Sequence, residues 1–431
     1  MTILRAAIFH TPRNPFREAN ALAAYPDGAL ALDGGRVAAC GEYAEVRAAF
    51  PDAEVRDLRG GYILPGFVDT HIHFPQVRII GGLGYTLLDW LEQLTLPEEA
   101  RLADTAYASA VASEFVSSLA AHGTTTALVF GSHFAPATAA LFEAAEKRGL
   151  RVFSGLVLSD RSVRAELRQQ PEAAYRGCVS LMDRFRRYVV TPRFALSASE
   201  AMLEICGALL REHPGLRFTT HINENRQEVE EVARLFPWSR DYLNVYERFG
   251  LIGRNSVLAH NIHGNDDELR RLAAAGVSIA HCPTSNAALG SGIFPLARHL
   301  RAGARFALGT DVGGGTGFGM MKEALQAYLI QRVAAEPEIL TPAQMLYLAT
   351  RAGAEALGVE GETGDFAAGK CADLVYLRPP EGSVLKGVLR HAGDQSPERT
   401  VGALFTLADA ACIEEVQMSG RAVFQSREAI N

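Results

Sequence analysis

The sequence of 431 residues has only six cysteines, and no two of them are spaced as Cys-x-x-Cys. This scatter excludes a disulfide framework and a zinc ribbon, because both need cysteines at short, regular spacings. It also excludes the metal site of cytidine-deaminase-type proteins, in which a Pro-Cys-x-x-Cys segment supplies ligands. Scattered cysteines are typical of a reduced compartment, so we expect a cytoplasmic protein.

The chain also lacks blocks of basic residues and long apolar runs. Its net charge is -7, and lysine occurs only at positions 147, 322, 370 and 386. No surface for a nucleic acid or an anionic membrane is therefore predicted. No apolar run reaches the roughly 18 residues of a membrane span, and residues 1–15 lack the apolar core of a signal peptide. We expect the partner to be a small-molecule substrate.

Both ends of the chain contain short apolar runs that are broken by turns. Asp33-Gly34-Gly35 separates two strand-like segments, which is typical of a β-hairpin. Near the C-terminus, strand-like runs occur at 372–377, 401–407 and 413–424. We predict that residues 1–64 and 365–431 meet in one small β-sandwich domain.

Residues 65–364 have a different rhythm, in which apolar strand-like runs alternate with helical segments. Strands that are apolar nearly throughout indicate a parallel sheet buried on both faces. Eight such units predict an α/β fold with a (β/α)8 TIM-type barrel, and an open doubly wound sheet is the alternative. The eight runs are residues 66–73, 123–131, 151–159, 188–197, 217–224, 256–263, 277–286 and 305–313.

Polar and ionisable residues gather where several of these runs end. A barrel brings the ends of all its strands around one opening, whereas an open sheet spreads them along an edge. The pattern therefore favours the barrel. The residues are His71, His73, Arg193, His221, Glu224, His260 and Asp311.

The strand-end histidines and carboxylates predict a metal site. His71 and His73 are two residues apart in a strand, so their side chains point to the same side. Alone, this pair would be interpreted as two core histidines. Further potential ligands, His221, His260 and Asp311, end three other runs. Three histidines and one carboxylate form a complete ligand set for a divalent metal, with a position left open for water.

Glu224 adds a candidate acid–base group to this site. It follows His221 by three residues, and a carboxylate that can reach a bound water is a recurring arrangement in hydrolases. In isolation, Glu224 would equally fit the first turn of a helix, and Asp311 would fit a loop cap. The combination indicates a metal-dependent hydrolase.

The segments that carry these residues resemble the amidohydrolase superfamily in order and spacing. They are LPGFVDTHIHFPQ (64–76), THINEN (220–225), LAH (258–260), HCPTSN (281–286) and GTDVGGGT (309–316). A narrower resemblance, to guanine deaminases, covers nearly the full length. It depends on Pro75-Gln76 and on the segments 86–99, 191–200 and 281–294.

The resemblance implies hydrolytic deamination of guanine to xanthine and ammonia by a metal-activated water. It also implies a homodimer and a metal that is usually zinc, with Fe²⁺ as the other candidate. The implied metal ligands are His71, His73, His221 and Asp311. The implied catalytic residues are Glu224 as proton shuttle, His260 beside the metal-bound water, and Asp311 as acceptor of the water proton. The implied substrate-binding residues are Gln76, Arg193, Phe194 and Glu224.

The residues also bear on specificity and on metal number. An arginine fork at position 193 suits the 6-oxo acceptor of guanine and would be unpaired against the amino group of adenine. Phe194 would cover the base, although core packing explains it equally well. No lysine falls on a barrel strand, and the ionisable residue of the fourth run is Arg193, so the carboxylated lysine of two-metal amidohydrolases has no equivalent. We expect one metal ion per chain.

Two departures from the family pattern and two alternative functions stay open at this point. Asn223 stands where serine is expected, and Leu94-Thr95-Leu96 replaces an aromatic-rich stretch. Another amidohydrolase, acting on a pterin, another oxo-purine or a triazine, would use the same metal ligands. A non-catalytic scaffold on the same fold is the second alternative, but it predicts missing ligands, and none is missing.

Overall fold

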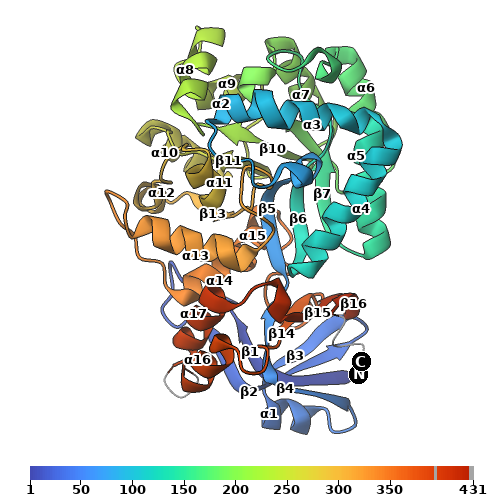
Figure 1. Ribbon diagram of the computed structural model, residues 1–431, viewed down its shortest axis with the longest axis vertical. Coiled ribbons are helices and arrows are strands. Elements are labelled where there is room, and N and C mark those ends of the chain that lie inside the picture. The colour runs from blue at the N-terminus through green and yellow to red at the C-terminus, as the bar shows by residue number, and fades with distance from the viewer. Residues whose placement is uncertain (393–395, 427–431) are drawn as a thin grey trace.

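The computed structural model describes residues 1–392 and 396–426, and its strands form a barrel above a separate sheet (Figure 1). Each of the eight predicted runs contains a barrel strand. The barrel strands are β5 (Phe67–His73), β6 (Thr124–Phe130), β7 (Arg151–Gly155) with its continuation β8 (Val157–Leu158), β9 (Val189–Pro192), β10 (Arg217–Ile222), β11 (Ser256–His260), β12 (Ser278–His281) and β13 (Arg305–Leu308).

Neighbouring barrel strands pair in parallel, and backbone contacts close the ring. A bridge between Ser154 and Tyr188 joins β7 to the start of β9. The N–H of Asp311, after β13, donates to the carbonyl of His71 on β5 at 2.8 Å, and the N–H of His73 donates to the carbonyl of Val312 at 3.0 Å. The strands therefore form a closed barrel, and the open-sheet alternative is wrong.

Helices cover the outside of the barrel, and their ends follow from local sequence. Asp104 caps α4 by accepting hydrogen bonds from the N–H groups of Ala106 and Tyr107. Gly149 ends α5 with a positive φ of 87°, a conformation that favours glycine. The helices of this region are α2 (Leu87–Trp90), α3 (Leu96–Ala100), α4 (Thr105–Ala121), α5 (Ala135–Arg148), α6 (Pro171–Met182), α7 (Glu200–Glu212), α8 (Arg226–Leu235), α9 (Tyr242–Arg248), α10 (Asp266–Ala275), α11 (Pro283–Ala288), α12 (Leu296–Ala302), α13 (Met320–Gln331), α14 (Pro342–Ala349) and α15 (Arg351–Ala356).

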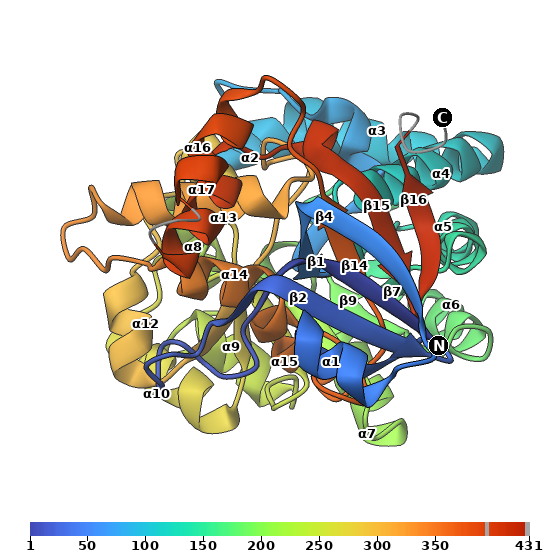
Figure 2. The ribbon, with the colours of Figure 1, turned by 90° about the horizontal axis from the view of Figure 1, so that it is seen from below.

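The two chain ends form one seven-stranded sheet, as Figure 2 shows from below. Its order is β16-β15-β14-β4-β1-β2-β3, and the antiparallel pair β14–β4 joins the C-terminal strands to the N-terminal ones. The strands are β1 (Thr2–His10), β2 (Ala23–Asp33), β3 (Arg36–Glu42), β4 (Glu54–Pro65), β14 (Leu374–Leu377), β15 (Ile413–Met418) and β16 (Arg421–Gln425), with helix α1 (Tyr43–Ala49) beside them. The predicted α/β class, with a TIM-type barrel and a β domain built from both chain ends, is confirmed, although the strands of that domain form one sheet where a sandwich was predicted. The domain limits at 64/65 and 364/365 stay a prediction.

One predicted strand is wrong. Residues 401–407 belong to helix α17 (Pro397–Leu407), which follows α16 (Val384–Ala392). Ser396 accepts a hydrogen bond from the N–H of Arg399, and Pro397 occupies the first helical turn. A short apolar run fits a strand or a buried helix equally well. Ser396 and Pro397, which precede the run, favour the start of a helix. Among the described residues, no helix is long and apolar enough to span a membrane.

Candidate active site

Four side chains meet at the C-terminal opening of the barrel. His71 and His73 come from β5, His221 from β10, and Asp311 from the segment after β13. The Nε2 atom of His73 lies 3.2 Å from the Nε2 atoms of both His71 and His221. Asp311 Oδ1 lies 3.2 Å from His71 Nε2 and 3.3 Å from His73 Nε2. All four side chains are buried.

These four groups fit a metal cation. Burial lowers the pKa of His73 to about 4 and also lowers the pKa values of His71 and His221. Three neutral rings therefore direct ring nitrogens at one another and at a carboxylate, an arrangement that needs a positive charge at its centre. Zinc–ligand bonds of about 2.1 Å place neighbouring ligand atoms about 3 to 3.6 Å apart, a range that includes these separations.

Neighbouring groups hold the ligands in place. His221 Nδ1 donates to the backbone carbonyl of Arg193 at 2.6 Å, which leaves the Nε2 lone pair for a metal. The ring of Phe130, at the end of β6, packs against His71, His73 and His221, with centroid distances of 4.9, 4.6 and 4.7 Å. This apolar contact keeps water away from one side of the cluster.

A buried aspartate also joins the strands that carry the ligands. Asp69 accepts hydrogen bonds from the N–H of His71 at 3.1 Å and from the N–H and hydroxyl of Thr310 at 3.1 and 2.5 Å. Burial raises the pKa of Asp69 to about 7. These bonds fix the end of β13, and hence Asp311, against β5.

Glu224 and His260 lie beside the cluster. Glu224 Oε2 is 3.4 Å from His260 Nε2, which is 3.8 Å from Asp311 Oδ2. His260 Nδ1 donates to Asn286 Oδ1 at 2.9 Å, so the other ring nitrogen faces the carboxylates. Burial, followed by the charge of Asp311, raises the pKa of Glu224 well above its usual range. Glu224 is therefore suited to hold a proton at neutral pH.

A narrow cavity of about 20 Å³ lies beside the cluster. Gln76, Arg193 and Phe194 line it together with Glu224 and the metal-ligand candidates. Leu87, Trp90 and Leu91 form its apolar side, at the junction of α2 and the π-helical turn Leu91–Thr95. The apolar lining thus comes mainly from residues that precede Leu94-Thr95-Leu96, the stretch that departs from the family pattern.

Glu99, on α3, is a polar residue of the site that no sequence motif predicts. Its Oε1 accepts from Gln76 Nε2 at 2.9 Å, and its Oε2 accepts from Arg193 Nη1 at 2.6 Å and lies 3.4 Å from His133 Nδ1. Gln76 Oε1 in turn accepts from the N–H of Gly313 at 3.1 Å. Glu99 lies within the quoted segment 86–99, but nothing in that segment indicates a buried charge.

Every residue predicted for the site from the sequence lies in this one region. Two further polar residues, Asn286 and Ser291, also belong to it. Ser291 Oγ donates to Glu224 Oε1 at 3.4 Å. Both fall in the quoted segment 281–294, so the segment was singled out although the two side chains were not.

The structure also accounts for Asn223. Its φ of 52° is left-handed, a conformation that asparagine tolerates better than most residues. Its Nδ2 donates to Asn261 Oδ1 and to Glu268 Oε1, both at 3.1 Å. Glu268 also accepts from the N–H of Leu243 at 3.1 Å, which connects the turn to α9. Asn223 therefore holds the turn that presents Glu224.

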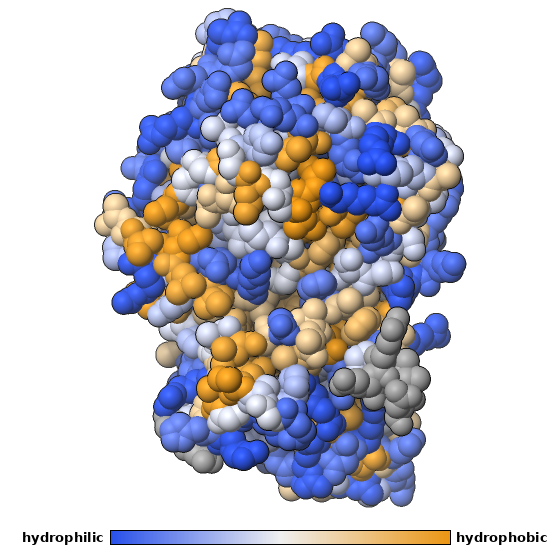
Figure 3. Space-filling model, viewed as in Figure 1, coloured by the Kyte–Doolittle hydropathy of each residue, from blue (hydrophilic) through white to orange (hydrophobic). Residues whose placement is uncertain are grey.

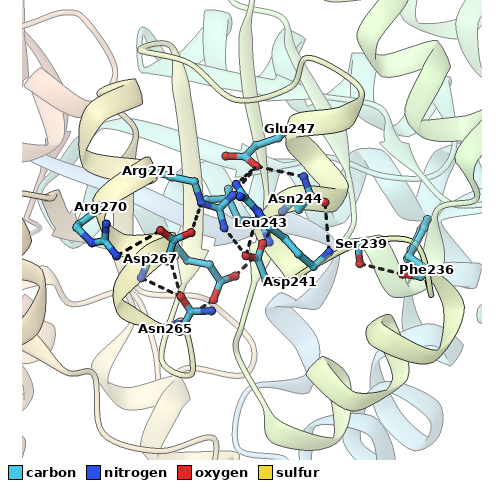
Figure 4. A network of polar contacts seen from close by, with 12 residues as sticks. Phe236, Ser239, Asp241, Leu243, Asn244, Glu247, Asn265, Asp267, Arg270 and Arg271 are labelled. Carbon is cyan, nitrogen blue, oxygen red and sulfur yellow. Dashed lines mark hydrogen bonds and ion pairs between the residues drawn. The ribbon is translucent and has the colours of Figure 1, made fainter.

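An ion-pair network fastens the two helices behind this turn (Figure 4). Arg271 of α10 pairs with Asp241 and Glu247 beside and within α9, and its Nε donates to Asp267 at 2.9 Å. The network lies outside the barrel wall. It keeps α9 and α10 together, and so keeps Glu268 in reach of Asn223.

Comparison with known proteins places the chain among purine-processing hydrolases. The amidohydrolase family model matches residues 62–423, and a bacterial imidazolonepropionase-like composite domain matches residues 28–53. The chain is 57% identical to a probable guanine deaminase of Deinococcus radiodurans over 440 aligned positions, with 100% of both chains covered.

Solved structures agree with this similarity. The guanine deaminase of E. coli superposes with a TM-score of 0.92 at 35% identity, and 99% of each chain is covered. The guanine deaminase of Bradyrhizobium japonicum superposes with a TM-score of 0.93 at 32% identity, also over 99% of each chain.

Proposed function

This chain belongs to the amidohydrolase family, and from that premise we propose that it is an enzyme that hydrolyses guanine to xanthine and ammonia. One observation supports this most directly. Metal-ligand candidates, the buried carboxyl group of Glu224 and an arginine–glutamine pair all line one cavity. The full-length similarity to guanine deaminases points to the same substrate.

The metal is best described as one zinc ion per chain, with Fe²⁺ as the alternative. His71, His73, His221 and Asp311 would hold it, and when bound it lowers the pKa of water so that hydroxide is available at neutral pH. A second group, His260 with Cys282 and Asp311, has the spacing to bind a cation. However, burial raises the pKa of the Cys282 thiol well above its usual range, and a protonated thiol is a poor ligand.

The lysines give no support for a second ion either. Lys370 is buried but pairs with Asp365 at 2.6 Å, and Lys322 donates to the carbonyl of Thr316. Lys147 belongs to α5 and Lys386 to α16. None lies at the barrel opening, so no carboxylated lysine is available as a bridge between two ions.

The protein residues supply the proton transfers. Glu224 donates its proton to the ring nitrogen next to C2 of guanine, which makes that carbon electrophilic. Asp311 Oδ1 faces the histidines, so Oδ2 is the oxygen free to accept a proton from the attacking water. His260 Nε2 faces the same region. Because Nδ1 donates to Asn286, the imidazolium form of His260 would direct its second N–H at the attacking oxygen as charge develops. Glu224, ionised by the first transfer, then takes the remaining proton from the attacking oxygen and gives it to the leaving amine, so that the C–N bond breaks and ammonia leaves. The proton held by Asp311 restores Glu224 for the next cycle.

Arg193 and Gln76 account for base selection. The guanidinium of Arg193 has five N–H donors, and Glu99 accepts from one nitrogen, so donors remain for the 6-oxo group of guanine. Adenine would place its amino donor there, leaving two donors opposed in a buried site. Phe194 is buried at the cavity wall, in position to cover a base.

We further propose a cytoplasmic homodimer. Large apolar side chains are exposed on and after α13 and near α16 and α17, and Figure 3 shows apolar surface over these elements. The side chains are Leu329, Val333, Ile339, Val384, Val388 and Leu407. Several exposed apolar side chains on one face of a molecule are typical of a protein–protein interface. Sedimentation of the protein, compared with a Val333→Glu/Val384→Glu variant, tests whether this patch joins two copies.

Ammonia release from a panel of heterocycles tests the function. The metal-loaded protein should deaminate guanine and leave adenine unchanged. A panel with a pterin, other oxo-purines and triazines separates guanine deamination from the related hydrolyses. An Asp311→Asn variant serves as control for contaminating activity, since it should lose turnover. Faster turnover of a pterin or triazine than of guanine would contradict the proposal.

A further inference from the structure

Glu99 has no role in the proposed reaction, yet it contacts both residues that are proposed to bind the base. Its carboxylate accepts from both Gln76 and Arg193, the two residues proposed to hold the base, and Glu99 itself is only 2% exposed. The next residue back, Glu98, points elsewhere, toward Arg101 at 2.9 Å and the hydroxyl of Tyr107. Two adjacent glutamates of one short helix therefore have separate partners.

The ion pair with Arg193 at 2.6 Å favours the charged form of Glu99. The Arg193 guanidinium and His133, against the desolvation by burial, hold the pKa of Glu99 down at about 2, so it is an anion at all moderate pH values. Burial lowers the pKa of His133 to about 4, so that ring is neutral above that pH. The base end of the cavity therefore holds one cation, Arg193, and one anion, Glu99, 2.6 Å apart.

We propose that Glu99 makes the cavity selective for neutral purines, by orienting Arg193 and Gln76 and by cancelling the charge of Arg193. This rests on the proposed function. Guanine is neutral near pH 7. Xanthine has a second oxo group, is a stronger N–H acid, and becomes an anion just above neutral pH. Without Glu99, an unbalanced guanidinium in a buried cavity would retain that anion, and the enzyme would be inhibited by its own product.

Glu99 is thus a positioning residue for Arg193 and Gln76. Its charge has a second effect, on the binding of ionised xanthine, which can be measured separately. His133 Nδ1 faces Glu99 at 3.4 Å, and its ring is neutral above about pH 4. The ionisable groups that line the cavity, apart from Arg193, are the same residues in every variant, so comparison of variants isolates the contribution of Glu99. These groups are His73, His221, Glu224 and Asp311. Their titration is common to the wild type and the variants, so a difference between the pH profiles reports on Glu99 and on the ionisation of xanthine.

The test measures competitive inhibition by xanthine from about pH 6 to about pH 9 in the metal-loaded enzyme. In the wild type, inhibition should weaken as xanthine ionises. In Glu99→Gln, inhibition should strengthen with pH and be roughly 10-fold tighter than in the wild type at the alkaline end, an estimate for one uncompensated buried charge. The kcat/KM for guanine should also fall roughly 10-fold, since one carboxylate no longer accepts from both Gln76 and Arg193.

Two further variants separate charge from position. Glu99→Asp keeps the charge but is shorter, so it should lose guanine turnover while its xanthine profile stays like that of the wild type. Glu98→Gln, the matched control, should leave both properties unchanged.

Each outcome decides the proposal. A Glu99→Gln profile parallel to that of the wild type would overturn it, as would wild-type inhibition that strengthens with pH. The wild-type and Glu99→Asp measurements keep the test decisive should Glu99→Gln fold poorly. A wild type that releases no ammonia from guanine refutes the proposed function instead, and calorimetric binding of xanthine to the same variants still tests Glu99.

Discussion

Replacing Glu224 by glutamine tests the proposed proton transfer directly. Protonated glutamate and glutamine have nearly the same size and the same lack of charge, so the contacts with Ser291 and His260 can persist. The amide cannot donate and regain a proton in the reaction. We expect kcat to fall about 10²- to 10⁴-fold, equivalent to about 3 to 5 kcal/mol of activation free energy. Metal content should stay that of the wild type.

The raised pKa of Glu224 also predicts a change in stability. In the metal-free protein, Glu224 is protonated when folded but ionises in the unfolded chain above its ordinary pKa of 4.5. Its contribution to stability is thus complete below that pH and is lost as pH rises toward the folded pKa. Glutamine does not titrate, so the variant should become more stable than the wild type with rising pH, by about 1.4 kcal/mol per pH unit over this range.

The assay compares urea unfolding of chelated wild type and Glu224→Gln near pH 5 and near pH 8. Steady-state deamination and metal analysis are measured on the loaded proteins. Glu230→Gln, the same substitution at an exposed position of α8, is the matched control and should change neither property. Near-normal turnover in Glu224→Gln would remove this residue from the mechanism. A stability difference that does not grow with pH would show that its carboxyl is not held neutral.

Four other predictions concern binding, orientation, pH and metal number. Arg193→Ala should lower kcat/KM for guanine by about 10²-fold with metal content unchanged, because a buried hydrogen-bonded charge pair is broken; unchanged guanine kinetics would mean that another residue binds the base. Asn286→Ala should lower kcat roughly 10-fold by freeing the ring of His260, and unchanged kcat would exclude that orienting role. Burial lowers the pKa values of His133 and His299 to about 4, so both rings stay neutral in the folded protein at pH values where they gain a proton in the unfolded chain. Their contribution to stability is therefore complete above about pH 6.5 and is lost as pH falls toward 4. Urea unfolding across this range should show a loss of several kcal/mol in the free energy of unfolding. Titration of metal-free protein with zinc should restore full activity at one equivalent per chain; activity that needs a second equivalent would contradict the one-metal site.

The sequence predicts the barrel and the metal cluster well because both depend on local patterns. Buried parallel strands need apolar runs, and a period of two places His71 and His73 on the same side of β5. The contacts of Glu99 could not be predicted in this way. It meets Arg193 across 94 residues of sequence, through the packing of α3 over the barrel opening. The expected strand at 401–407 failed for a related reason, since tertiary packing and the capping residues before the run determine its structure.

The two contacts of Arg193 bear on how such an enzyme could acquire a new substrate. Its carbonyl fixes the ring of His221, whereas its side chain faces the base cavity. A carbonyl is present whichever amino acid occupies the position. The side chain at 193 can therefore be exchanged, together with Glu99, without removing the hydrogen bond that orients the metal ligand. The orientation of the metal ligand thus depends on the backbone at position 193, whereas substrate choice depends on the side chain. A library randomised at positions 193 and 99 is therefore a direct route to enzymes for other heterocycles.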